Sequence, residues 1–294
     1  ALHVEDERAD ENRHASQVNN YEGFFEKFHS CHNTLGVMAE TYAFLGTGSM
    51  GGAILDGLVS GAGDVVVRST TRSSTASRAG VESRSTESDA NANRWAVDGA
   101  TVVVIGVKPA MVTDLLREIA EALDPAALVI SVAAGVTTAT MESVVTNPVI
   151  RAMPNTPALI GKGVTGISSG SRATAENLAT ARHLFEVVGW VLELPETQID
   201  ALSTISGSGP AYVFHAMEQW TRAAVELGFT EADARNLVEK TFAGATALQE
   251  STGVDPAELR RRVTSPNGTT ERAIAVLDEA QLRALASVMA RKSA

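Results

Sequence analysis

A glycine-rich stretch near the start of the chain has the residue spacing of a phosphate-binding loop. Residues 42–45 are apolar enough to form a buried strand, and Gly46, Gly48 and Gly51 follow at the start of a helical pattern. The first glycine permits a tight turn, the second lets the backbone approach a pyrophosphate, and the third lets helix and strand pack closely. Because free amides at a helix start attract anions, the stretch predicts a loop that binds a dinucleotide.

A second copy of this glycine spacing lies at residues 161–166. No apolar strand precedes it, and Val164, Thr165 and Ile167 favour a strand after it instead of a helix. We interpret the second copy as a turn between strands.

Two further loops carry hydroxyl groups and free backbone amides directly before predicted helices. Residues 205–212 include Ser208 and also Pro210, which suits the first helical position, and residues 264–270 are similarly rich in hydroxyl groups. Each loop taken alone is an ordinary helix start, but the two together are suited to hold a small carboxylate. A redox step carried by a nicotinamide needs little from such a site except orientation of the acceptor.

Other chemistries have little support in the sequence. The chain shows no Ser-His-Asp set, no close carboxylate pair and no cluster of metal ligands, so hydrolysis is disfavoured. His183 and His215 lie within helical patterns and are interpreted as packing or surface residues. Lys108 ends a predicted strand, where it either faces the cofactor or marks a solvated turn.

Length and charge restrict the class of protein. At 294 residues the chain is long enough for two domains. Its formal net charge of −11 disfavours a nucleic-acid or anionic-membrane partner, and no segment approaches the roughly 18 apolar residues that span a bilayer. The single cysteine, Cys31, excludes an internal disulfide and a thiolate zinc cluster. Because the first residues lack a secretory signal, we expect a cytoplasmic enzyme.

Composition and periodicity divide the chain into three parts. Residues 1–40 are polar and are predicted to be a disordered leader, so a variant that lacks residues 1–37 should stay active. Residues 41–195 alternate strands with helices, which predicts a doubly wound α/β domain. Residues 196–294 carry helical patterns only.

Individual elements follow from the same patterns. In the α/β part we expect strands at residues 64–67, 101–107, 128–132, from 149 up to Pro154, 163–168 and 190–194, and helices at 111–123 and 175–188. The polar segment that follows residues 68–72 and runs up to residue 100 is expected to be helical or irregular. In the last part we expect helices at 210–227, 230–251, from 255, and at 279–290.

The end of the second strand bears on the choice of cofactor. NAD-binding chains commonly carry an acidic residue there to bond the ribose 2′-hydroxyl. This chain instead has Arg-Ser-Thr-Thr-Arg at residues 68–72, which suits a 2′-phosphate. The sequence therefore favours NADP, with NAD as the alternative.

Five stretches of the chain resemble the pyrroline-5-carboxylate reductase family, whose members catalyse the last step of proline synthesis. The first is shared by many dehydrogenases, whereas the last two together are specific to the family. The resemblance implies NAD(P)H-dependent reduction of 1-pyrroline-5-carboxylate to L-proline by a Rossmann-type domain followed by an all-α dimerisation domain. It also implies a homodimer, which in some members builds a larger ring of dimers. The stretches are residues 44–51, 107–109, 151–157, 206–212 and 265–270.

The resemblance also implies roles for individual residues. Those expected to hold the substrate carboxylate and ring nitrogen are Ser208, Gly268, Thr269 and Thr270, with Glu196 near the substrate. Those expected at the cofactor are Gly46, Thr47, Gly48, Ser49, Met50, Gly51, Ser69, Thr70, Arg72, Val107, Lys108, Pro109 and Asn155.

One departure from the family pattern lies in the last loop. Asn267 stands where the family usually has glycine. Since asparagine tolerates a left-handed backbone better than most residues, we expect the turn to survive. The alternatives left open are a related reductase of another cyclic imine or a β-hydroxyacid, and a non-catalytic dinucleotide-binding regulator.

Overall fold

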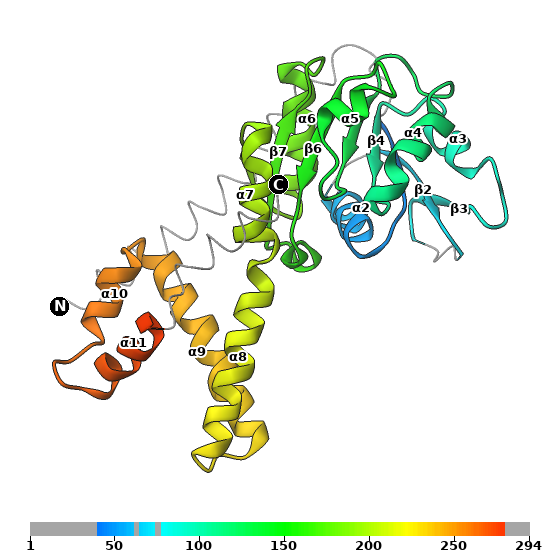
Figure 1. Cartoon of the computed structure of the whole chain (residues 1–294). Coiled ribbons are helices and arrows are strands. Elements are labelled where there is room, and N and C mark those ends of the chain that lie inside the picture. The colour runs from blue at the N-terminus through cyan, green and yellow to red at the C-terminus, as the bar shows by residue number, and fades with distance from the viewer. Residues whose placement is uncertain (1–39, 62–64, 74–77, 280–294) are drawn as a thin grey trace, which may run out of the picture. The chain divides into compact units, whose positions relative to one another are not determined.

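The computed structural model of the chain describes residues 40–61, 65–73 and 78–279. One eight-stranded sheet organises the part up to residue 193 (Figure 1). Its strands are β1 (Thr41–Leu45), β2 (Val66–Thr71), β3 (Val81–Ser85), β4 (Val102–Ile105), β5 (Leu128–Ser131), β6 (Val149–Met153), β7 (Gly163–Ser169) and β8 (Gly189–Glu193).

The strand order in space is β3-β2-β1-β4-β5-β6-β7-β8. Neighbours from β3 to β6 are parallel, β7 is antiparallel to β6, and β8 is parallel to β7. The order reverses at β1, between β2 and β4, which makes the carboxyl end of β1 the switch point where doubly wound sheets bind ligands. This arrangement confirms the predicted Rossmann-type fold.

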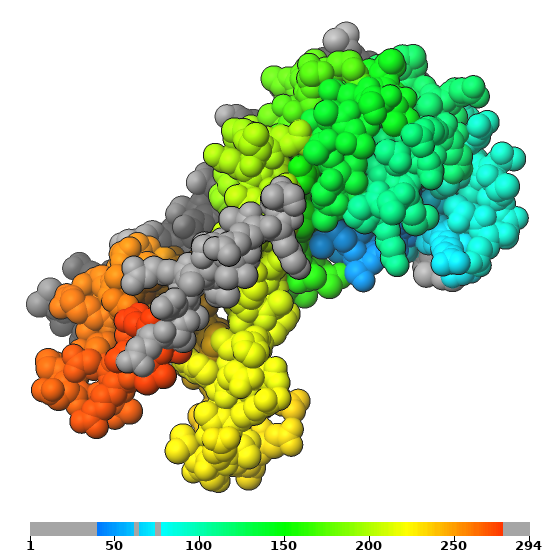
Figure 2. Space-filling model, viewed as in Figure 1, coloured from blue at the N-terminus to red at the C-terminus, as the bar shows by residue number. Residues whose placement is uncertain are grey.

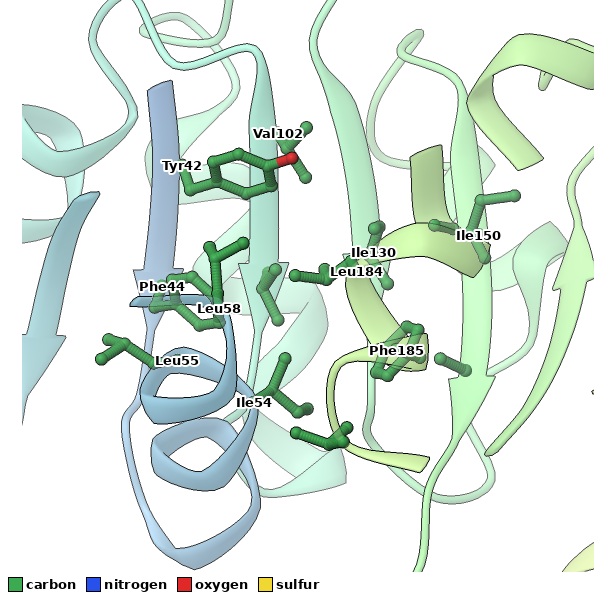
Figure 3. Close-up of a cluster of buried hydrophobic side chains, with 14 of the residues drawn as sticks. Tyr42, Phe44, Ile54, Leu55, Leu58, Val102, Ile130, Ile150, Leu184 and Phe185 are labelled. Carbon is green, nitrogen blue, oxygen red and sulfur yellow. The ribbon is translucent and has the colours of Figure 1, made fainter. Parts of the chain in front are cut away.

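Helices cover both faces of the sheet, which explains why its central strands are apolar throughout. On one face, Ile54 and Leu58 pack with Phe44 and Phe185 (Figure 3). On the other face, Leu45 packs with buried residues of three further helices. The helices of this part are α2 (Ser49–Gly61), α3 (Ala92–Val97), η1 (Pro109–Met111), α4 (Val112–Ile119), α5 (Thr138–Glu142), η2 (Thr156–Ile160) and α6 (Ala175–Glu186); α2 and α6 cover the first face, and α3, α4 and α5 the second.

The described elements from residue 196 onward are all helical. They are η3 (Glu196–Gln198), α7 (Ile199–Leu202), the π-helical turn η4 (Ser203–Gly207), α8 (Gly209–Glu226), α9 (Glu231–Thr252), α10 (Pro256–Arg262) and α11 (Thr269–Glu279). α8 and α9 pack as a hairpin in which the ring centroids of Trp220 and Phe242 lie 5.0 Å apart, edge to face (Figure 1). None of the helices in the described part of the chain has the length and apolar character needed to cross a membrane.

The helical hairpin leaves large apolar side chains in water. Phe214 on α8 is 64% exposed, and Leu227, which caps the end of α8, is 81% exposed. α8 is drawn in yellow in the space-filling view (Figure 2). Exposed apolar groups of this size are typical of surfaces that contact another chain.

Three expected elements differ from the structure. β2 continues to Thr71 instead of ending at residue 67, because its polar side chains find partners inside the fold. β3 lies in the segment expected to be helical or irregular; its sequence, VESRS, has a single apolar residue and lacked a strand signal. The helix expected at 111–123 is η1 followed by the shorter α4. The leader and the helix expected at 279–290 lie outside the described residues, except for residues 40 and 279.

Candidate active site

The glycine loop between β1 and α2 has the backbone geometry of a phosphate-binding loop. Gly46 has a φ of +86°, a left-handed conformation that favours glycine. The amides of Gly46 and Thr47 both donate to the carbonyl oxygen of Thr70, at 3.1 and 3.2 Å, which fixes the loop to β2. α2 then begins at Ser49, so the free amides of its first turn lie at the carboxyl end of β1.

Each glycine of the loop meets a different environment. A Cβ atom on Gly51 would stand 2.6 Å from the carbonyl oxygen of Gly46, and one on Gly106, after β4, would also meet that oxygen. A Cβ atom on Gly48 would meet no protein atom within 4 Å. Two glycines therefore serve the close packing of the loop, and Gly48 keeps open the space that a pyrophosphate would use.

A buried hydroxyl group supports the assignment of this loop to a ligand. Thr47 Oγ1 is buried and has no hydrogen-bond partner among the described residues. Buried polar atoms are rarely left without a hydrogen bond, and a phosphate oxygen at the loop would accept a hydrogen bond from this hydroxyl group. The geometry of the loop and the unsatisfied hydroxyl both fit a dinucleotide.

The end of β4 lies beside the glycine loop, because β1 and β4 are adjacent and parallel. The amide of Gly106 donates to the carbonyl oxygen of Leu45 at 2.8 Å. Val107 packs against Gly46, and Lys108 and Pro109 follow as exposed residues at the same edge of the sheet. Lys108 therefore lies at the carboxyl edge of the sheet, beside the glycine loop. Gly106 was not singled out in the sequence, although a glycine that ends a β-branched run is a usable signal.

The end of β2 requires a correction. Ser69 and Thr70 were expected to hold cofactor phosphates, but both are buried inside the strand, at 0% and 1% exposure. The Ser69 hydroxyl is hydrogen-bonded to Ser83 at 2.7 Å, and the Thr70 hydroxyl donates to Asn93 at 2.9 Å. Thr70 contacts the glycine loop through its backbone carbonyl instead.

Two arginines at β2 also differ in availability. Arg68 lies within the strand, and its guanidinium donates to the carbonyl oxygens of Trp95 and Asp98. Arg72 follows the last residue of the strand, with its side chain 89% exposed and an ion pair to Glu87 at 3.3 Å. Of the two arginines, Arg72 is the one with an exposed side chain.

Asn155 uses its side-chain amide within the fold. It was expected beside the ribose and nicotinamide, and the structure shows it buried with both side-chain polar atoms bonded inside the chain. Nδ2 donates to the carbonyl oxygen of Ser206 at 3.0 Å, and Oδ1 accepts from the amide of Val164 at 2.8 Å. Asn155 thus joins the end of β6 to β7 and to the turn η4.

Glu196 was expected near the substrate, and the structure gives its carboxylate partners within the chain. Its two oxygens accept from the amide and hydroxyl of Thr138 at the start of α5, at 2.7 and 2.6 Å. Arg151, whose side chain is 4% exposed, reaches Glu196 at 3.5 Å and Asp200 at 2.5 Å. The sequence did not single out Arg151, although an arginine inside an apolar strand is a signal for a buried ion pair.

Ser208 lies at the junction between η4 and α8. Its side chain makes no capping hydrogen bond to the helix, and the residue is exposed. Its amide donates to the carbonyl oxygen of Ser203 at 2.9 Å, which closes the π-helical turn. Pro210 lies in the first turn of α8, one residue after the helix begins at Gly209, whereas it was predicted at the first helical position. The Ser208 hydroxyl is therefore available at the start of a long helix.

The loop before α11 keeps its turn despite the asparagine. Asn267 has a φ of +61° and is the one residue other than glycine with a left-handed backbone in the described part of the chain. The backbone amide of Asn267 donates to the carboxylate of Glu271 at 2.7 Å, and the backbone amide of Gly268 donates to the carbonyl oxygen of Ser265. α11 begins at Thr269, so Thr269 and Thr270 lie in its first turn, whereas they were expected in the loop before it.

The described residues contain no group of His, Cys, Asp and Glu that could hold a metal ion. His183 and His215 are exposed on α6 and α8, in agreement with their interpretation as packing or surface residues.

Comparison with known proteins covers both parts of the chain. Residues 196–294 match the family model for pyrroline-5-carboxylate reductase dimerisation, and residues 41–135 match the model for NADP oxidoreductase, coenzyme F420-dependent. The chain is 39% identical to a pyrroline-5-carboxylate reductase of Corynebacterium melassecola, over 83% of this chain and 92% of that protein. It is 40% identical to the Pseudomonas aeruginosa enzyme of the same name, over 79% and 86%.

Solved structures agree with these sequence matches. A pyrroline-5-carboxylate reductase of Coxiella burnetii is 35% identical, with a TM-score of 0.77 over 86% of this chain and 95% of that one. The fold is also shared with the Plasmodium falciparum pyrroline carboxylate reductase solved with NADP bound, which is 24% identical, with a TM-score of 0.77 over 88% of this chain and 98% of that one. The chain belongs to the pyrroline-5-carboxylate reductase family.

Proposed function

We propose that the protein catalyses the NAD(P)H-dependent reduction of 1-pyrroline-5-carboxylate to L-proline, the last step of proline synthesis. The observation that carries this proposal is the joint presence, in one chain, of an open glycine loop at the switch point of the sheet and a helical part of the family's dimerisation type. The loop geometry supports cofactor binding, and the family supports the substrate.

The chain's own residues would bind and orient the reactants. The backbone from Gly46 to Gly51 would hold the pyrophosphate, with Val107, Lys108 and Pro109 beside the ribose and nicotinamide. A bound nicotinamide would supply the hydride for the imine carbon, and a proton from solvent would complete the amine at the ring nitrogen. Ser208 would hold the substrate carboxylate together with the loop at the start of α11, whose residues are Gly268, Thr269 and Thr270. Hydroxyl groups and amides at helix starts suit this task because they donate to an anion without adding a titrating group.

NADPH is the preferred cofactor in this proposal, with NADH as the weaker alternative. Arg72 supports the preference, because an exposed guanidinium at the end of β2 can meet a 2′-phosphate with charge-assisted hydrogen bonds. Its present partner, Glu87, is 55% exposed and can move away into water.

The functional unit in this proposal is a homodimer. The exposed apolar side chains of the α8–α9 hairpin support it, because pairing with a second copy would remove them from water. A cofactor-binding domain at residues 41–195 and a helical dimerisation domain at 196–294 suit this assembly. A larger ring of dimers and a cytoplasmic location are expectations from the family and the sequence alone.

The test is the oxidation of NADPH and NADH, measured side by side with 1-pyrroline-5-carboxylate. We expect turnover with both cofactors and a higher kcat/KM for NADPH. Turnover with a different cyclic imine or a β-hydroxyacid, without turnover of 1-pyrroline-5-carboxylate, would favour a related reductase. Tight NADPH binding with no turnover of any of these compounds would favour a non-catalytic regulator.

A further inference from the structure

The segment from Glu196 to Ser208 leads from the sheet into α8, and it is held at two points by residues that belong to β6 or follow it directly. Asn155 holds the carbonyl oxygen of Ser206 through Nδ2, at 3.0 Å. Because Oδ1 of the same buried amide accepts from Val164 of β7, the side chain is fixed at both ends.

The second point is a buried guanidinium. Arg151 pairs with Asp200 at 2.5 Å and with Glu196 at 3.5 Å, while its side chain is 4% exposed. A buried arginine needs carboxylate partners, so this ion-pair network keeps α7 and η3 against β6. Glu196 is fixed in addition by its two hydrogen bonds to Thr138.

The turn that contains Ser206 has an uncommon shape. Residues Ser203–Gly207 form a π-helical turn, a conformation that is rare and appears mostly as single turns at functional sites. Gly207 lies close to Met153 at the end of β6, since a Cβ atom on it would stand 3.2 Å from the Met153 methyl group. The direction of Ser208 therefore depends on how the turn is held on β6.

We propose that Arg151 and Asn155 are positioning residues for substrate binding. In this account they fix the path of residues 196–208, and thereby aim Ser208 and the first amides of α8 at the substrate carboxylate. Neither residue touches the substrate or cofactor. The inference rests on the proposed function for the role of Ser208, and it replaces the expected contacts of Asn155 with the cofactor and of Glu196 with the substrate.

The matched test compares two buried asparagines. Asn155→Asp keeps an acceptor for the Val164 amide but sets a carboxylate against the Ser206 carbonyl oxygen. Asn147→Asp sets a carboxylate against backbone carbonyl oxygens elsewhere in the fold, because Asn147 is also buried and donates to the carbonyl oxygens of Asp124 and Ala127. Both variants should lose stability to a similar extent.

Only Asn155→Asp should alter substrate binding. We expect its KM for 1-pyrroline-5-carboxylate to rise about fivefold to tenfold, the range that loss of one hydrogen bond gives, with an unchanged Kd for NADPH. If Asn155→Asp fails to fold, Asp200→Asn should show the same rise in KM, since asparagine keeps an oxygen that accepts from Arg151 but lacks the charge that holds the guanidinium. Equal KM shifts for Asn155→Asp and Asn147→Asp, or no shift for the position-155 and position-200 variants, would overturn the proposal.

A second readout separates this inference from the proposed function. Amide hydrogen exchange across residues 203–208 should be faster in Asn155→Asp than in Asn147→Asp, whether or not the wild type reduces 1-pyrroline-5-carboxylate. A wild type without turnover would reject the proposed function, and the exchange rates would still decide whether the turn is held by Asn155. Equal exchange in the two variants would overturn the inference by itself.

Discussion

Gly51, in the first turn of α2, packs so closely on Gly46 that a Cβ atom on Gly51 would lie 2.6 Å from the Gly46 carbonyl oxygen. The start of the helix and the turn that leaves β1 are therefore one compact unit. Gly48, between them in the sequence, has no protein atom within 4 Å of its Cβ position. Two glycines only three positions apart therefore have different roles. Gly51 is needed for packing, and Gly48 leaves room for a ligand.

This difference predicts opposite effects for two glycine variants. Gly51→Ala should lower the free energy of unfolding by roughly 1–3 kcal/mol, the usual cost of overpacking. Gly48→Ala should fold with a free energy of unfolding within about 0.5 kcal/mol of the wild type, yet bind NADPH at least roughly tenfold more weakly. Urea unfolding and NADPH titration measure both quantities. A Gly48→Ala protein with wild-type NADPH affinity would show that the pyrophosphate does not approach this position.

Arg72 should determine the preference for NADPH. Arg72→Ser removes the exposed cation at the end of β2, so kcat/KM for NADPH should fall roughly tenfold or more while kcat/KM for NADH changes little. Arg117→Ser is the matched control, because Arg117 is an exposed arginine with an acidic partner, Asp114, on α4. A parallel loss with both cofactors in Arg72→Ser would contradict its assignment to the 2′-phosphate.

The hydroxyl of Thr269 should matter for the substrate and not for the cofactor. Thr269→Val keeps the shape of the side chain but removes one donor, so KM for 1-pyrroline-5-carboxylate should rise about fivefold or more with the Kd for NADPH unchanged. Thr101→Val serves as the control. Thr101 lies before β4, at the edge of the sheet opposite to the carboxyl edge that carries the glycine loop. Equal weakening of both ligands in Thr269→Val would place Thr269 elsewhere.

Glu142 should make the stability of the α/β part depend on pH. Burial acts to raise the pKa of Glu142, but hydrogen bonds from Ser171 and Arg172 outweigh it and lower the pKa below its ordinary value of 4.5. The ionised carboxylate therefore stabilises the fold at pH values above the unfolded-state pKa, and this contribution is lost as pH falls through the lower pKa of the folded protein.

The matching variant is Glu142→Gln, which cannot ionise. Its free energy of unfolding should lie below that of the wild type by roughly 0.5 kcal/mol at about pH 7, because water screens this half-buried carboxylate, and the difference should shrink as the pH falls below 4.5. Urea unfolding at several pH values measures the difference. A gap that stays constant over this range would mean that the charge of Glu142 does not contribute.

Local patterns in the sequence were sufficient to predict most of the fold. The β-branched run that forms β4 and the glycine loop before α2 predicted a doubly wound sheet. Pro210 indicated the start of α8. The left-handed turn at Asn267 followed from a local preference of the asparagine backbone. β3 was missed because its polar sequence gains its strand partners only from the neighbouring β2.

Side-chain partnerships were harder to foresee, because they depend on contacts far apart in the sequence. Ser69 and Thr70 were expected at the ligand, but the longer β2 buries them against Ser83 and Asn93. Asn155 bonds a residue 51 positions away, a distance that no local pattern reports. Position at a strand end predicted where the site lies, but not which polar groups the fold uses for itself.

The central claim is that hydride passes from a nicotinamide at the glycine loop to the imine carbon of 1-pyrroline-5-carboxylate. Reduction with NADPH that carries deuterium at the transferred position of the nicotinamide tests it directly, with mass spectrometry of the product. We predict L-proline with one deuterium on the ring carbon of the former carbon–nitrogen double bond. Absence of proline, or proline that carries no deuterium at that carbon, would contradict the account.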